Sequence, residues 1–174
     1  MRILLAGLFL PFLILTHRPN VKGQDWRQII PLESTRADVE RLLGSTTGAY
    51  FGEYELKQGS LFIEYSSGPC RPERKGGWNV PRDVVIMVNF SPKRRTRIAE
   101  LKLDPKKFKK VVDEHVIGIL YYVNDEEGIT YQVQRGKIDF VEYGPKQRDA
   151  HLYCGDPPDK QSQAQAWHGI VPLK

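Results

Sequence analysis

Few side chains in the sequence have the types and spacing that enzymatic chemistry requires. The motifs G-x-x-x-x-G-K-[ST], G-x-G-x-x-G and G-x-S-x-G do not occur. His115, His151 and His168 lack the spacing of metal ligands. Glu64 and Glu142 could form an acid and base pair, but equivalent positions in two similar hairpins also explain them. We therefore predict no catalytic residue, no bound metal and no cofactor.

One segment of the sequence concentrates positive charge. Residues 93–110, the basic segment, contain nine basic and two acidic side chains, a net charge of +7. Such a segment can bind an anionic lipid, a polysaccharide or an acidic protein, although a solvated loop and helix face is the simpler interpretation. The candidate binding residues in it are Arg94, Arg95, Arg97, Lys106, Lys107 and Lys110.

A second candidate surface is the loop of residues 66–82, which contains three glycines and three prolines. Loops of this length are often functional. Arg71, Arg74 and Trp78 lie in it close to Cys70, and tryptophan and arginine are enriched at the energetic centres of interfaces. The alternative is that Trp78 folds back onto the core.

Residues 1–23 have the form of a signal peptide. Arg2 gives a positive start, and the apolar run from Ile3 to Leu15 is too short to span a membrane. We expect cleavage after Gly23; an uncleaved anchor is the alternative. The leader has three basic and no acidic residues, so the mature chain carries a net charge of +2 instead of +5. Specific nucleic-acid binding is therefore disfavoured, and we expect no transmembrane span in the mature chain.

Export would place the two cysteines in an oxidising compartment. Cys70 and Cys154 then most simply form a disulfide. A nucleophilic Cys70 assisted by His115 or His151 is the alternative.

Residues 26–103 predict one helix followed by strands. Thr35 is a good N-cap, Asp38 completes a capping box, and Gly44 ends the helix. Alternating apolar residues predict a hairpin over 54–65, and further strands are expected over residues 84–90 and 97–103.

Residues 104–154 predict the same layout again. Asp104 followed by a proline predicts a second helix, and strands are expected at 121–124, 129–133 and 137–143. An extra residue relative to the first hairpin predicts a β-bulge near Asp139 to Val141.

We therefore expect an α+β fold with helices packed on an antiparallel β-sheet. Residues 24–154 would form a single domain, with helix-plus-hairpin pseudo-repeats over about 26–103 and 104–154. The alternative to duplication is that hairpins simply resemble each other. The Pro- and Gln-rich residues 155–174 predict a flexible tail.

The stretch L-E-S-T-R-A-D-V-E-R-L-L-G, residues 32–44, resembles the helix motif of small cell-envelope proteins of the SmpA/OmlA (BamE-like) type. A threonine or serine cap, an aliphatic residue four positions later and a closing Leu-Gly carry the resemblance. A tandem helix-plus-sheet layout resembles the β-lactamase inhibitor protein fold. Glu33 and Ser34 depart from the family pattern, and the lipidated cysteine is missing, so lipid anchoring does not carry over.

Together these features predict an exported, non-enzymatic binding or assembly module of the cell envelope, periplasmic or secreted. It would bind an envelope protein or an anionic envelope component through the basic segment and the loop that carries Trp78. The alternatives are a small secreted hydrolase that uses Glu64, Glu142 or a histidine, and an inhibitor of a secreted enzyme.

Overall fold

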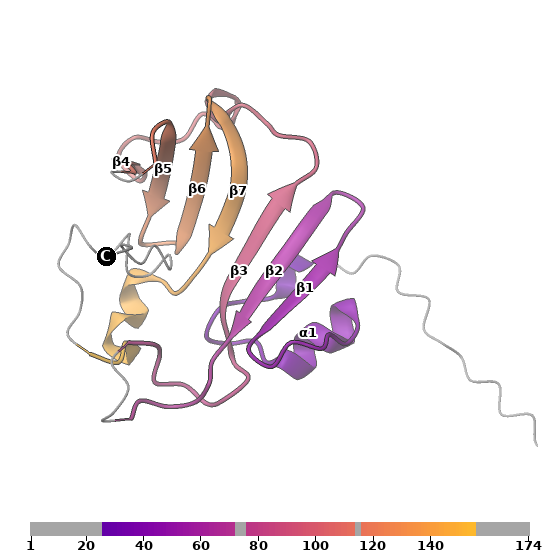
Figure 1. The fold of residues 1–174 in the computed structure, drawn as a ribbon. Coiled ribbons are helices and arrows are strands. Elements are labelled where there is room, and N and C mark those ends of the chain that lie inside the picture. The colour runs from indigo at the N-terminus through magenta and orange to yellow at the C-terminus, as the bar shows by residue number, and fades with distance from the viewer. Residues whose placement is uncertain (1–25, 72–75, 114–115, 156–174) are drawn as a thin grey trace, which may run out of the picture.

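The computed structural model describes residues 26–71, 76–113 and 116–155. They form a seven-stranded antiparallel sheet in the order β1-β2-β3-β7-β6-β5-β4, shown in Figure 1. The strands are β1 (Phe51–Glu55), β2 (Gly59–Tyr65), β3 (Val85–Pro92), β4 (Lys109–Val112), β5 (Ile119–Asn124), β6 (Ile129–Gln134) and β7 (Lys137–Tyr143). The helices are α1 (Arg36–Leu43) and the 3-10 helices η1 (Trp26–Gln28), η2 (Ile98–Leu101) and η3 (Gln147–Leu152). Strands β1 and β4 therefore form the two edges of the sheet.

The first helix begins and ends where the sequence predicts. The Thr35 N–H donates to the Asp38 carboxylate at 2.9 Å, and the Asp38 N–H donates to the Thr35 hydroxyl at 3.3 Å. This reciprocal pair satisfies two amides that the first helical turn leaves without partners. Gly44 ends the helix at φ 92°, in the left-handed region that glycine adopts without strain.

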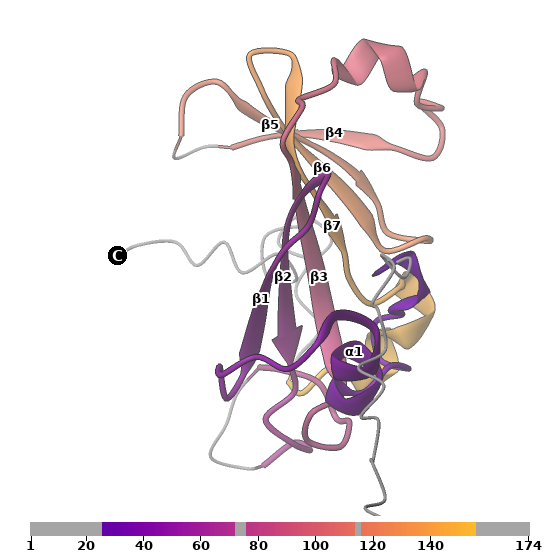
Figure 2. The ribbon, with the colours of Figure 1, turned by 90° about the vertical axis from the view of Figure 1, so that its right-hand side faces the viewer.

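The main core lies between α1, η1 and one face of strands β1, β2 and β3. Buried side chains alternate with more exposed ones along β1 and β2, as expected for a sheet covered on one face. The cluster consists of Trp26, Ile29, Val39, Leu42, Tyr54, Leu61, Ile63, Tyr65, Val85 and Val88. Figure 2 shows α1 at one end of the strands, with η2 and β4 at the other.

The predicted fold class is wrong. The sheet dominates the structure, and α1 is the only α-helix in the described ranges. The second helix-plus-hairpin unit is not found among the described residues of 104–154, where strands β4 and β5, and no α-helix, precede the hairpin β6–β7. The two similar hairpins instead flank β3, which pairs with β2 on one side and with β7 on the other.

Asp104 caps a single turn instead of a second helix. The Lys107 and Phe108 amides both donate to the Asp104 carbonyl at 3.0 Å, and the chain then becomes strand β4. A continued helix would place lysines at i, i+3 and i+4 spacings, where like charges repel. The paired valines that follow favour a strand, and β5 provides their partner.

The strand predicted over residues 97–103 is also wrong. Residues 98–101 form η2, which ends at Lys102 in the left-handed region with φ 47°. Arg97 forms a single antiparallel bridge with Lys137 at the start of β7, and the chain then turns into η2, which ends the pairing after one residue.

The other strand predictions are confirmed, including the bulge. Gln132 pairs with Phe140 and Val133 pairs with Ile138, which leaves Asp139 as the extra residue in β7. The predicted leader, residues 1–23, and all but the first residue of the predicted tail, residues 155–174, lie outside the described residues.

Candidate binding surfaces

The basic segment, residues 93–110, leads from β3 to the edge strand β4. All nine of its basic side chains are exposed. It crosses the turn between β6 and β7, where the Ile98 N–H donates to the Gly136 carbonyl at 3.1 Å and the Ile138 N–H donates to the Thr96 carbonyl at 2.9 Å. Figures 1 and 2 both place this connection at the end of the sheet remote from α1. The predicted basic residues of this segment therefore lie at one end of the molecule.

Three of the nine basic side chains have partners within the protein. Arg95 forms an ion pair with Asp139 at 2.6 Å, and Lys109 forms one with Asp125 at 2.9 Å. Lys93 donates to a main-chain oxygen at 3.0 Å. The remaining six make no ion pair or hydrogen bond with any described residue, and they are Arg94, Arg97, Lys102, Lys106, Lys107 and Lys110.

The loop of residues 66–82 is tied to the chain that follows η3. A disulfide joins Cys70 to Cys154, with the Cα atoms 5.5 Å apart, which confirms the predicted pairing. Two main-chain hydrogen bonds support it: the Gly76 N–H donates to the Cys154 carbonyl at 2.8 Å, and the Cys154 N–H donates to the Gly77 carbonyl at 2.9 Å. The described part of the loop is thus held close to the body of the protein.

Trp78 faces inward. Its side chain is 8% exposed, and it packs with Val84 in a second, smaller core cluster. Its ring also meets the ring of Tyr153 edge-on, with the centroids 5.4 Å apart. Arg71 is exposed, and Arg74 lies outside the described residues. Of the three contact residues predicted in this loop, Arg71 alone is both described and exposed.

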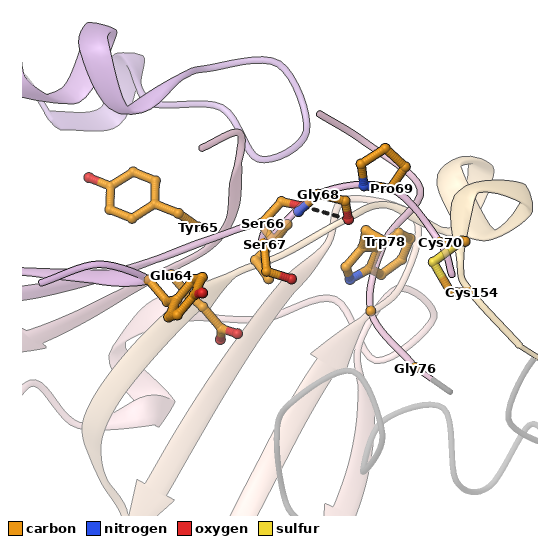
Figure 3. A pocket seen from close by; sticks show the side chains of 13 residues that line it. Glu64, Tyr65, Ser66, Ser67, Gly68, Pro69, Cys70, Gly76, Trp78 and Cys154 are labelled. Atoms are coloured by element: carbon orange, nitrogen blue, oxygen red, sulfur yellow. Dashed lines mark hydrogen bonds between the residues drawn. A yellow bond between two sulfur atoms is a disulfide. The ribbon is translucent and has the colours of Figure 1, made fainter. Parts of the chain in front are cut away.

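A cavity of about 110 Å³ lies where the loop meets β2 (Figure 3). Its lining includes Glu64, Ser66, Trp78 and the disulfide. The Gly68 N–H donates to the Ser66 hydroxyl at 3.0 Å, which holds the wall of the cavity in place. Figure 3 shows Glu64 at one side of this lining and the disulfide at the other. The cavity has room for a few water molecules but is smaller than a typical cavity for an organic ligand.

Glu64 and Glu142 lie on the same face of the sheet, opposite α1. Glu64 pairs with Met87 and Glu142 pairs with Asn89, so the two carboxyl groups flank β3. Burial raises the pKa of the Glu64 carboxyl, and the negative charge of Glu142 raises it further. Glu142 is itself only 2% exposed. The fold therefore brings together two carboxyl groups that the sequence places 78 positions apart.

The exposed features of the two sheet edges were missed by the sequence interpretation. The β1 edge exposes Glu53, Glu55 and Phe51, whose side chain is 46% exposed. The β4 edge exposes Val112 at 59%, and the turn that follows it exposes Ile117 completely. The alternation F-G-E-Y-E already indicates which residues point away from the core. It does not indicate that β1 lies at an edge, because strand order depends on distant segments.

Within the described ranges, none of the helices is long and apolar enough to cross a membrane. The same residues contain no group of three histidine, cysteine or acidic side chains that could hold a metal ion. No protein-family model matches the chain, and comparisons with curated proteins and with solved structures give no match. The resemblance of residues 32–44 to BamE-like proteins therefore stays a prediction.

Proposed function

We propose that the protein is an exported binding or assembly module of the cell envelope, whose basic segment binds an anionic partner. The observation that carries the proposal is the set of six basic side chains at one end of the sheet without an acidic partner among the described residues. Unpaired, exposed charges of one sign attract an oppositely charged surface. The disulfide and the predicted leader support export, since disulfides persist in oxidising compartments.

The surface used for binding is narrower than the sequence predicts. Arg95 is already paired with an aspartate, which leaves five of the six predicted residues of the basic segment: Arg94, Arg97, Lys106, Lys107 and Lys110. Lys102, which was not predicted, is the sixth basic side chain without a partner among the described residues. Of the predicted loop residues that the structure describes, Arg71 is exposed and can contribute, whereas Trp78 is buried.

Charge reversal at two arginines tests the proposal. Arg94→Glu with Arg97→Glu should lower the affinity for immobilised poly-L-glutamate roughly tenfold, which corresponds to about 1.4 kcal/mol. Surface plasmon resonance measures this affinity, and binding should weaken as salt increases, since exposed charges are screened. Unfolding of the variant should match the wild type, since both side chains are exposed.

The matched control reverses two exposed basic residues elsewhere, Arg41 and Lys57. This control changes the net charge by the same amount but leaves the basic segment intact. If the control loses as much affinity as the test variant, net charge alone explains binding and the proposed site is wrong.

A further inference from the structure

The outer side of β1 carries main-chain groups that the sheet does not use. The Leu56 N–H donates to the Gly59 carbonyl at 2.8 Å, and this bond fixes which residues of the strand face β2. Since these groups alternate along an antiparallel strand, the N–H and C=O groups of Phe51, Glu53 and Glu55 point away from the sheet.

The usable part of this edge is short. Gly48 packs against the Phe51 carbonyl oxygen and covers it. Glu53 and Glu55 are therefore the two open positions of β1, and their side chains are exposed on the face opposite α1.

The outer side of β4 is open in the same way. The Asp113 N–H donates to the Ile119 carbonyl at 3.2 Å, in register with the β4–β5 ladder. By the same alternation, the main-chain groups of Lys110 and Val112 point away from the sheet. No described residue bonds to them.

The two open edges complement each other in charge and in apolar surface. Each edge exposes one large apolar side chain, Phe51 on β1 and Val112 on β4. The β1 edge adds Glu53 and Glu55, whereas the β4 edge adds Lys110. Pairing two β1 edges over Glu53 and Glu55 would place glutamates opposite one another, which is destabilising. Pairing two β4 edges over their open positions would place Lys110 opposite Lys110 or Val112, without an opposite charge. Pairing β1 with β4 places opposite charges together.

We propose that β1 of one copy pairs antiparallel with β4 of a second copy, which joins two sheets edge to edge. The inference rests on the proposed function, because it identifies the anionic partner of Lys110 in the basic segment as the β1 edge of another copy. In the pairing register, Glu55 lies opposite Lys110 and Glu53 lies opposite Val112, and each pair exchanges two main-chain hydrogen bonds. Phe51 is then the diagonal neighbour of Val112, within reach of an aromatic side chain.

The geometry of the sheet allows this pairing. Strands β1 and β4 run in the same direction, since six antiparallel pairings separate them. An antiparallel pair therefore requires the second copy to be turned over. Within one copy, the strand registers place Glu53 on the sheet face opposite α1 and Lys110 on the face that carries α1. When the second copy is turned over, its Lys110 side chain therefore lies on the same face of the joined sheet as Glu53 of the first copy. Each joined pair keeps one free β1 and one free β4, so further copies can add.

Sedimentation equilibrium of the purified chain, with its disulfide intact, tests the proposal. One pair of short strands buries much less surface than a standard interface, so we expect weak association that increases with concentration. Glu55→Lys and Lys110→Glu should each lower the association constant roughly tenfold. The double variant restores an opposite-charge pair and should recover most of the wild-type association.

A main-chain variant tests the strand pairing itself. Val112→Pro removes an N–H that the sheet does not use, and proline is tolerated at such positions on edge strands. It should leave unfolding nearly unchanged and weaken association. Glu126→Lys, an exposed charge reversal in the β5–β6 turn, is the matched control for Glu55→Lys and should leave the association constant unchanged.

The outcomes separate this inference from the proposed function. A wild type that stays monomeric at all concentrations, or a double variant that fails to recover, overturns the edge pairing. If binding to poly-L-glutamate still depends on Arg94 and Arg97, the proposed function stands without it. Binding of a monomeric chain to phosphatidylglycerol vesicles through Lys110 would identify a lipid partner and also overturn the pairing.

Discussion

At the residue scale, the start of α1 depends on Thr35 and Asp38. Thr35→Ala removes the hydroxyl that caps the helix, and such changes cost about 1 kcal/mol of unfolding free energy. Urea unfolding followed by circular dichroism measures the loss. Thr47→Ala, in the exposed loop that follows α1, is the control and should change stability much less. Equal stability of both variants would show that the cap contributes nothing.

The same cap predicts a pH dependence. The hydrogen bonds from the Thr35 hydroxyl and N–H, and the one from Arg41, lower the pKa of the Asp38 carboxyl to about 2. A lowered pKa means that the folded state favours the charged form. The stabilisation is therefore present above the ordinary pKa of 3.8 and is lost as pH falls towards 2. The difference between wild type and Thr35→Ala should shrink over this pH window.

The capping box could be predicted from sequence because both of its partners lie within one helical turn. The ion pair between Arg95 and Asp139 could not, since the strand pairing that brings these residues together depends on the whole sheet. The burial of Trp78 is similar, because Tyr153 covers it from the far end of the chain.

At the scale of elements, Arg36 joins α1 to two other segments. Its guanidinium donates to the Asp83 carboxylate at 3.0 Å and to the carbonyls of Gly48 and Ala49 at 3.0 and 2.6 Å. The same group lies 3.9 Å from the ring centroid of Tyr65. One side chain thus connects the helix, the chain entering β1 and the chain entering β3.

Arg36→Lys should destabilise the protein, since one ammonium group cannot reproduce the fork of donors. We expect a loss of about 1.5–3 kcal/mol in the free energy of unfolding, the range for hydrogen bonds that involve a charged group. Chemical denaturation measures it. Arg41→Lys, at an exposed position of the same helix, should cost less than about 0.5 kcal/mol. A similar small loss at Arg36 would contradict the connecting role.

Local sequence signals explain why the helix prediction is correct for α1 and wrong for residues 104–112. Both regions have a good N-cap, but α1 continues with apolar residues that reach the core, such as Val39 and Leu42. Asp104 is followed by a run of lysines that cannot pack against the sheet as a helix. Capping signals therefore locate a turn, while packing decides whether a helix continues from it.

At the scale of the whole molecule, the strand order was the part that the sequence could not provide. Alternation identified the hairpins, and an extra residue relative to the first hairpin identified the bulge at Asp139, since both signals are local. It could not show that β3 and β7 pair, or that Glu64 and Glu142 share a face. The edges of the sheet, on which the proposed pairing depends, follow only from that order.

The disulfide closes a covalent ring within the fold. Cys70 and Cys154 lie 84 positions apart, and strands β3 to β7 all fall between them. The segments α1, β1 and β2 precede the ring. A mechanical force applied to the two ends of the chain would therefore pass through the sulfur–sulfur bond and bypass five of the seven strands.

Single-molecule stretching in an optical trap should show this division. The oxidised chain should extend only by the residues outside the ring, whereas a reductant should release roughly 280–300 Å more, the extended length of 84 residues. Equal final lengths in both conditions would contradict the ring. Under tension, then, the α1, β1 and β2 segments would unravel while the strands that carry the β4 edge remained mechanically shielded.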